Sequence, residues 1–457
     1  MRVIGLVVHL HYLCKPETLI SLTGKSRTVG NERRAVGGVT AYKYWPWKPA
    51  STHSLTEATH NTTTTDRQTA DRMSPKRVIY KKLSRDKSVG VYMGKRDFVD
   101  HCDFVDPVDG VVLVDPEQVK GKKVYVMLSC TFRYGREDMD VMGMVFRRDI
   151  FLCSRQVYPP LQDKERSVHT KVQEKILRKL GDNAYPFFFE FPDNLPCSVC
   201  LQPGPTDVGK HCAVEFEVKA FCAENQDEKA QKRSSVRLAI RKIQYAPDTG
   251  GAAPSADTTC EFIMSDKPLH MRVSLEKETY YHGEEINISV DIDNSSNRNV
   301  KDLSVSVEQV TNVVLYSNDK YVKTVAYEDT MDTVPSGTSL KKVYTLCPLL
   351  DNNRERLGLA LDGKLKHEDT NLASSSVVKD EVLKEILGML VAYRVVVKCN
   401  AAGIVGSSEV AVEVPFKLMH PKPDPESEDT VDLVFEEFKR SYLKGVIGDD
   451  DESPAEP

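Results

Sequence analysis

The alternation of apolar and polar residues predicts two blocks rich in β-strands. In the first block, which begins near Pro75, every second residue from 214 to 220 is apolar, and a period of two is typical of a half-buried strand. The same period returns in the second block, from 286 to 292 and from 410 to 414. Two antiparallel β-sandwiches in tandem, an all-β fold, are the simplest arrangement of such blocks.

One segment near residue 175 departs from the strand pattern and predicts a short amphipathic helix. Apolar side chains recur there at helical spacing, a capping box precedes them, and a glycine follows them. The apolar positions are Val172, Ile176 and Leu180, the capping pair is Thr170 and Gln173, and the glycine is Gly181. Residues 379–390 also have helix propensity, but they continue into the β-branched residues 395–397, so we expect a strand there.

Composition indicates where the domains, the linker and the two terminal segments begin and end. Residues 1–72 are basic and show neither the period of two of a strand nor the period of 3.6 of a helix. We therefore expect a disordered N-terminal extension or an artefact of the gene model. The sandwiches are expected at residues 73–245 and 258–420, joined by a hinge rich in Pro, Gly and Ala at 246–257. Residues 421–457 form an acidic tail. Its apolar island, residues 433–438, is expected to dock on the body as an added strand, because aromatic residues do not ordinarily sit in a solvated tail.

Charge, cysteines and motifs narrow the class of function. The 457 residues carry a net charge of −5, which gives no reason to expect nucleic-acid binding. The 11 cysteines are an odd number without framework spacing, as expected of reduced thiols in the cytosol. A hydrolase would use His367, Glu368 and Asp369, yet the chain contains neither an HExxH nor a GxSxG pattern. We therefore expect a binding protein, not an enzyme, with no metal and no cofactor.

Basic residues are concentrated in a few places, and their clustering would create a local anion site on an otherwise acidic chain. They include Lys81, Lys82, Arg85, Lys87, Lys95, Arg96, Arg178, Lys179, Lys232 and Arg233. Solvated strand edges explain the same residues equally well. The loop at 362–369 favours the anion site, since it places three carboxylates and two lysines between apolar flanks.

Several longer motifs are more specific than these patterns. They are residues 95–97 (KRD), 106–115 (DPVDGVVLVD), 132–135 (FRYG), 179–186 (KLGDNAYP), 195–199 (LPCSV), 236–238 (VRL) and 361–371 (LDGKLKHEDTN). Chance does not supply so many motifs in register. Together they resemble the arrestin family over residues 73–442, which implies two immunoglobulin-like sandwiches, an arrestin N-domain and C-domain, and a protein that binds an activated, phosphorylated G-protein-coupled receptor.

Within that family, residues 84–88, 264–269 and 415–421 favour the visual branch that acts in rod photoreceptors. The resemblance then implies that the protein binds light-activated, phosphorylated rhodopsin, blocks transducin coupling and so terminates phototransduction, a step of sensory transduction in vision. The alternative is a cone arrestin, or a non-visual β-arrestin that desensitises and internalises other phosphorylated receptors. No clathrin box is present in the tail, and the adaptor motif is incomplete because Tyr442 stands where an arginine is needed.

The resemblance also implies a buried polar core between the sandwiches that holds the inactive state. It would consist of Asp97, Arg237, Asp362, Asp369 and Arg440. Receptor phosphates, with about −1.5 to −2 charges each, would compete with the carboxylates for Arg237. They would reach it along a basic surface made of Lys81, Lys82, Arg85, Arg96, Lys179, Lys232, Arg233, Lys364 and Lys366.

Three further sites follow from the same resemblance. Phe435 and Phe438 of the tail would pack against the anchor residues Val78, Ile79, Tyr80, Val172, Ile176 and Leu180. A finger loop would enter the receptor cavity, and it comprises Tyr134, Gly135, Arg136, Glu137, Asp138, Met139, Asp140, Val141, Met142 and Gly143. Ile404 and Val405 would make peripheral contact with the membrane.

The resemblance implies a place in the cell as well. We expect a cytoplasmic protein of the outer and inner segments of photoreceptors that is recruited to the disc membrane on light activation. Its expected partner is phosphorylated rhodopsin or another opsin. Self-association, and binding of an inositol polyphosphate to the basic surface, stay open as additional interactions.

Overall fold

The computed structural model describes the chain from residue 76 to residue 437, with gaps. The described residues are 76–136, 147–161, 169–202, 210–226, 228, 231–248, 251–314, 318–365, 370–379, 381, 383, 385–403, 406–423 and 432–437. They belong to one compact unit, Asp71–Pro457. The extension expected at residues 1–72 lies outside the described residues, as does most of the acidic tail.

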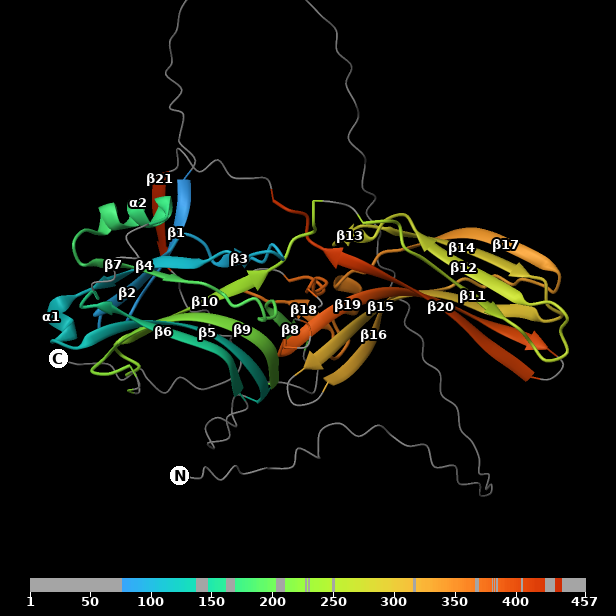
Figure 1. The fold of residues 1–457 in the computed structure, drawn as a ribbon, viewed down its shortest axis with the longest axis horizontal. Helices are drawn as coiled ribbons and strands as arrows, with labels where there is room; N and C mark the ends of the chain where they lie inside the picture. Colours follow the sequence, from blue (N-terminus) through green and yellow to red (C-terminus); the bar gives the residue numbers. More distant parts are fainter. Residues whose placement is uncertain are drawn as a thin grey trace, which may run out of the picture. The chain divides into compact units, whose positions relative to one another are not determined.

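The first half of the described chain forms two sheets around an apolar core (Figure 1). One sheet has the order β21-β1-β2-β4-β7, with β1 (Lys76–Leu83), β2 (Val89–Met93), β4 (Val108–Val114), β7 (Ala184–Phe189) and β21 (Asp432–Glu437). The other has the order β18-β8-β9-β10-β3, and β5 and β6 continue it from β9, with β3 (Asp97–Val99), β5 (Lys123–Arg136), β6 (Arg147–Tyr158), β8 (Val199–Leu201), β9 (Lys210–Ala223), β10 (Ser235–Ile243) and β18 (Ala360–Asp362).

The second half forms another pair of sheets. The first has the order β11-β12-β14-β17, with β11 (Ser255–Cys260), β12 (Leu269–Leu275), β14 (Ile286–Asn294) and β17 (Thr338–Leu346). The second has the order β13-β20-β19-β15-β16, with β13 (Thr279–Tyr281), β15 (Asn299–Val314), β16 (Asn318–Asp329), β19 (Gly388–Gly403) and β20 (Gly406–Met419). A short 3-10 helix, Asp351–Asn353, precedes β18. Since β11 begins at Ser255, strand pairing starts inside the expected hinge at 246–257.

The period of two in the sequence corresponds to one buried face per strand. In β14, the side chains of Ile286, Ile288, Val290 and Ile292 are all at most 2% exposed, and the residues between them are more exposed. Strands pair mostly antiparallel, apart from β1 with β21, β3 with β10 and β13 with β20. The prediction of an all-β fold with two sandwiches is therefore confirmed.

Two α-helices occur among the described residues, α1 (Pro116–Val119) and α2 (Lys171–Leu180). The capping box predicted for α2 is present. The backbone N–H of Gln173 donates to the Thr170 hydroxyl at 3.2 Å, and the backbone N–H of Thr170 donates to the side-chain oxygen of Gln173 at 3.1 Å. Gly181 ends the helix with a φ of 81°, which favours glycine. In the described part of the chain, neither helix has the length and apolar character of a membrane span.

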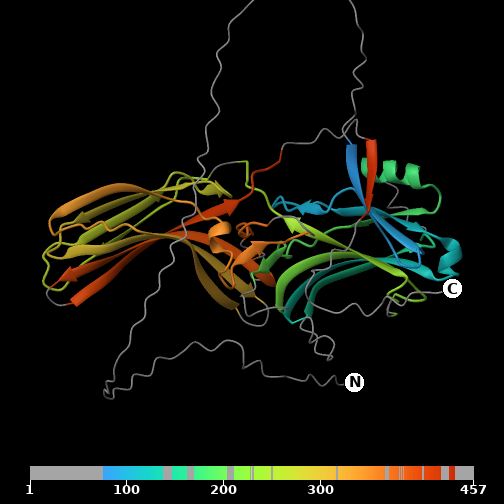
Figure 2. The same ribbon diagram turned by 180° about the vertical axis from the view of Figure 1, so that it is seen from behind.

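Two strands of the first sandwich come from much later in the chain. β18 pairs with β8 and so extends the seven-stranded sheet at its edge. β21 pairs in parallel with β1, with Phe435 opposite Ile79, and both views show the two strands side by side (Figure 1 and Figure 2). The expected added strand at 433–438 is thus present as Asp432–Glu437.

Candidate functional site

An ion pair between Arg241 and Asp97 lies on the seven-stranded sheet of the first sandwich. β3 and β10 run parallel there with Asp97 opposite Arg241. The guanidinium donates twice to the carboxylate, from Nε to Oδ1 and from Nη2 to Oδ2, both at 2.7 Å. This two-point geometry is the strong form of an arginine–carboxylate interaction. The side chains are 20% and 35% exposed, so water screens the pair in part.

Arg241 also reaches the segment that contributes β18. Its Nη1 donates to the carbonyl oxygen of Gly363 at 3.0 Å, and the Gly363 amide donates to Ser198 O at 3.0 Å. A Cβ atom at position 363 would lie 2.6 Å from the Ser198 Cβ, so only glycine allows this close approach. Arg241 therefore connects β3 and β10 with a chain segment that lies 122 residues away in sequence.

The sequence prediction assigned this central role to Arg237, and the structure corrects it to Arg241. The Arg237 side chain is 52% exposed and its nearest carboxylate contact is Glu217, at 3.6 Å from Nε to Oε1. Both arginines are on the same face of β10, four residues and so about 13 Å apart. A period of two cannot distinguish positions i and i+4. The pairing of β10 with the segment 95–97 decides which arginine meets Asp97. That pairing depends on the register between strands that are distant in the sequence.

The Asp362 carboxylate of the predicted polar core is held by a different set of contacts. Its Oδ1 accepts the Ser374 amide at 2.8 Å, and its Oδ2 lies 2.8 Å from His420 Nε2 and 3.2 Å from Ser374 Oγ. Asp369 and Arg440, the other expected members, lie outside the described residues. Asp97 and Asp362 thus face the same region, and the structure adds His420 to it.

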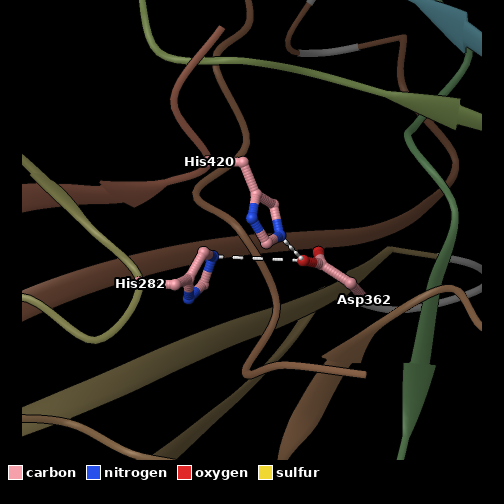
Figure 3. A group of neighbouring side chains, drawn as sticks. All are labelled: His282, Asp362 and His420. Carbon is pink, nitrogen blue, oxygen red and sulfur yellow. Dashed lines mark hydrogen bonds and ion pairs between the residues drawn. The ribbon is translucent and has the colours of Figure 1, made fainter. Parts of the chain in front are cut away.

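A second histidine completes a compact group with Asp362 (Figure 3). His282 Nε2 lies 4.0 Å from Asp362 Oδ2 and 3.0 Å from Ser374 Oγ, and the two imidazole rings are 4.3 Å apart at their centroids. Burial lowers the pKa of His282 to about 4, although the Asp362 carboxylate acts in the opposite direction. Neither histidine received a role from the sequence: His420 lies in the motif 415–421, and His282 lies 138 residues before it in no recognisable motif.

A cavity of about 500 Å³ connects the ion pair with this group. Its walls include Asp97, Arg241, Asp362, Ser374 and His420. Polar and charged side chains from both halves of the chain therefore line one space, where an anion or a cation would meet a charged partner.

Lys242, next to the ion pair, was missed by sequence reasoning. Its side chain is 1% exposed and its Nζ donates to Asp100 Oδ2 at 2.5 Å and to Leu195 O at 2.7 Å. Burial acts to lower the pKa of Lys242, but Cys197 and Asp100 raise it above its usual range. Alternation along β10 does place residue 242 on the buried face, where a lysine needs an acidic partner.

The predicted basic surface is present in part. Lys82 Nζ donates to Arg237 O at 2.5 Å, and the Asp86 amide donates to Arg233 O at 3.2 Å, so the β1–β2 turn lies against the start of β10. Lys219 on β9 is opposite Arg237, and both burial and the Arg237 charge lower the pKa of Lys219. Neither Lys219 nor Arg237 was assigned to this surface from the sequence.

The other predicted members differ in exposure. Lys81 is half-buried, whereas Arg85, Lys179, Lys232, Arg233 and Lys364 are exposed. Arg96 is 6% exposed and its guanidinium donates to Ala239 O at 2.9 and 3.0 Å, so in this structure it is not part of the exposed basic surface. Lys366 lies outside the described residues.

The anchor predicted for the tail is assembled on β1 and α2. Ile79 and Ile176 are buried together, and Val172 and Leu180 pack against them. Val78 and Tyr80 lie half-buried on the same strand as Ile79. β21 pairs with this strand through its backbone, whereas Phe438 lies outside the described residues. Residues 134–136 of the expected finger loop end β5, and residues 137–143, Ile404 and Val405 lie outside the described part of the chain.

Comparisons with known proteins agree with this architecture. Residues 89–246 match the family described as "Arrestin (or S-antigen), N-terminal domain", and residues 265–423 match "Arrestin (or S-antigen), C-terminal domain". The chain is 57% identical over 376 residues to S-arrestin of Xenopus laevis, with 81% of this chain and 94% of that protein covered. It is 58% identical to S-arrestin of Mus musculus (80% and 93% covered) and 57% identical to that of Homo sapiens (81% and 93% covered).

Proposed function

Since the chain belongs to the arrestin family, whose members desensitise receptors and are not enzymes, we propose that its receptor is light-activated, phosphorylated rhodopsin. In this proposal the bound protein blocks transducin coupling and ends the light response. The names of the similar proteins favour a visual receptor over the receptors of non-visual arrestins. We further propose that the protein resides in the cytoplasm of photoreceptors and moves to the disc membrane in the light.

The observation that carries the mechanism is the two-point ion pair between Arg241 and Asp97. A phosphate group offers oxygens that match the guanidinium fork as well as a carboxylate does, and it carries more charge. A receptor phosphate that reaches Arg241 would therefore compete with Asp97 and leave that carboxylate without its partner. Removal of one partner from a fully buried ion pair costs about 3 to 5 kcal/mol. The partial exposure of Asp97 reduces this cost, which would still destabilise the inactive arrangement.

The basic surface supplies a path for the phosphate. Lys82, Lys219 and Arg237 lie together at the start of β10, and Arg241 follows Arg237 on the same face of that strand. Cations in a row raise the local concentration of a polyanionic receptor tail. Arg237 thus acts in our proposal as a first contact for phosphate, and Arg241 as the switch.

The tail strand provides the second constraint. β21 pairs with β1 from Lys76 to Lys81, and Lys81 and Lys82 continue along the same strand. A phosphorylated segment attracted to these lysines would meet the acidic residues Glu436 and Glu437 opposite Tyr80 and Lys81. Like charges repel, so phosphate binding and docking of β21 oppose each other. Release of the tail would then accompany loss of the Arg241–Asp97 pair.

The test compares charge reversal at the two arginines of β10. We expect Arg241→Glu to bind light-activated rhodopsin without phosphorylation, because the substitution breaks the ion pair as a phosphate would. Arg237→Glu is the matched control: it should weaken binding to phosphorylated rhodopsin and keep selectivity for the phosphorylated form. Pull-down of each variant with phosphorylated and unphosphorylated rhodopsin, in light and dark, measures both. Phosphorylation-independent binding by Arg237→Glu alone would contradict the assignment of the switch.

A further inference from the structure

The group His282, Asp362 and His420 brings together three side chains from three separate segments. His282 follows β13, Asp362 ends β18, and His420 follows β20. One ligand atom from each lies within 4.8 Å of the other two (Figure 3). Among the described residues this is the one group of histidine, cysteine and carboxylate side chains with such convergence.

From this geometry we propose that His282 Nε2, Asp362 Oδ2 and His420 Nε2 form a binding site for a divalent transition-metal ion of the Zn²⁺ class. Two imidazoles and one carboxylate are a donor set that proteins use for Zn²⁺ with three protein ligands. Nitrogen donors disfavour Ca²⁺ and Mg²⁺, which prefer oxygen. The proposal goes beyond receptor binding and is independent of it.

The spacing of the donor atoms suits such an ion. Tetrahedral ligands at about 2.0–2.1 Å from zinc are about 3.3 Å from one another. Asp362 Oδ2 lies 2.8 Å from His420 Nε2 and 4.0 Å from His282 Nε2, so each separation is within about 0.7 Å of that value. All three ligand atoms lie within 4.8 Å of one another, so rotation of the side chains would have to bring the more distant atoms closer together.

The surroundings of the three donors favour coordination. The Ser374 amide donates to Asp362 Oδ1 at 2.8 Å, as a supporting contact does in known metal sites. The Ser374 hydroxyl donates to Asp362 Oδ2 at 3.2 Å and lies 3.0 Å from His282 Nε2, so a metal ion would replace these two contacts of the hydroxyl. The His282 side chain is only 9% exposed, so few water molecules compete for its Nε2. Asp362 and His420 also border the 500 Å³ cavity, which gives a fourth ligand such as water access to the ion.

A metal ion at this place would add a link between parts of the chain that also meet through hydrogen bonds, ion pairs and apolar packing. Asp362 belongs to a strand of the first sandwich's sheet, and His282 belongs to the second sandwich. His420 forms a bridge with Tyr245, which follows β10. The ion would therefore connect the two sandwiches beside the Arg241–Asp97 pair and stabilise the arrangement described above by mass action.

Nearby cysteines could also bind a metal ion, so the experiment must distinguish a site made of His282, Asp362 and His420 from a site made of cysteines. Cys197 lines the same cavity as Asp362, and Cys200 Sγ lies 3.8 Å from Asp362 O. Co²⁺ distinguishes the two kinds of site, because thiolate ligands give charge-transfer absorption in the near ultraviolet, which nitrogen and oxygen ligands lack.

The test uses the untagged, full-length chain, titrated with Zn²⁺ in equilibrium dialysis and with Co²⁺ in absorption spectroscopy. We expect one equivalent of metal per chain and visible cobalt bands without thiolate absorption. His282→Gln and His420→Gln should lower the affinity at least tenfold, and Ser374→Ala should lower it about tenfold or more through the orientation of Asp362. His101→Gln is the matched control, since His101 contacts Asp106 at 3.0 Å but belongs to no group of three possible metal ligands among the described residues, and it should leave binding unchanged.

Two results would overturn the proposal. The first is metal uptake that is equal in wild type, His282→Gln and His420→Gln, or that disappears only when cysteines are alkylated. The second is no uptake by the wild-type chain at micromolar metal, which would identify the group as a hydrogen-bonded network only. Circular dichroism of each variant checks folding, and a rise in the wild-type melting temperature with Zn²⁺ that a chelator reverses tests the site without any substitution.

Discussion

The coupling between Arg241 and Asp97 can be measured as a free energy of unfolding. The perturbation is a double-mutant cycle with Asp97→Asn, Arg241→Gln and the double variant. Each charge-assisted hydrogen bond contributes about 1.5 to 3 kcal/mol, and loss of one partner of a fully buried pair costs about 3 to 5 kcal/mol. The Asp97 side chain is 35% exposed, so solvent screening reduces these values. We expect a coupling energy of about 2 kcal/mol.

The assay is equilibrium urea unfolding followed by circular dichroism, with separate fits if the two sandwiches unfold in separate transitions. The pair of Arg237 on β10 and Glu217 on β9 provides an internal comparison, since Arg237 is on the same strand as Arg241. Their atoms are 3.6 Å apart and the arginine side chain is 52% exposed, so the coupling there should stay below about 1 kcal/mol. A coupling energy for Arg241 and Asp97 that is no larger than that of the exposed pair would refute the argument that this ion pair holds the inactive state.

Two further predictions concern the tail and the buried lysine. Truncation after Pro423 removes β21 from its place on β1 and should increase binding to light-activated, unphosphorylated rhodopsin in a pull-down; undiminished discrimination between the two receptor forms would count against the tail as a constraint. Lys242→Met leaves Asp100 without its 2.5 Å partner and should destabilise the protein by about 3 to 5 kcal/mol in urea unfolding, with Lys87→Met, an exposed lysine, as the neutral control. A loss below about 1 kcal/mol would show that the Asp100 carboxylate finds water or another donor.

The sequence was sufficient for features that depend on local period and local hydrogen bonds. Alternation at 286–292 predicted the buried face of β14, and Thr170, Gln173 and Gly181 predicted both ends of α2. Residues 379–390 were predicted as strand, yet β19 begins only at Gly388. The β-branched residues at 395–397 indicate that a strand is present, but they do not indicate where it starts. Boundaries of this kind depend on which partner strand is available.

The composition of the site depended on register between distant segments. The arginine that pairs with Asp97 follows from β3 running parallel to β10, and the sequence pattern fits Arg237 and Arg241 equally. His282 and His420 meet Asp362 through three strand ends that lie far apart in the sequence. Arg96 belongs to a motif that resembles the family, but the motif does not indicate that its guanidinium is directed to Ala239 O. The presence of a residue in a family motif therefore does not show which group its side chain contacts.

Two strands of the first sandwich, β18 and β21, come from late in the chain, and this affects how the chain can fold during synthesis. Exposed sheet edges are templates for association with other chains. β8 receives its outer neighbour only when residues 360–362 emerge, and β1 receives its neighbour only when residues 432–437 do. A nascent chain that has reached only residue 245 therefore presents a first sandwich in which β8 and β1 lack these neighbours, and the later addition of β18 and then β21 covers both edges and so protects the domain against aggregation.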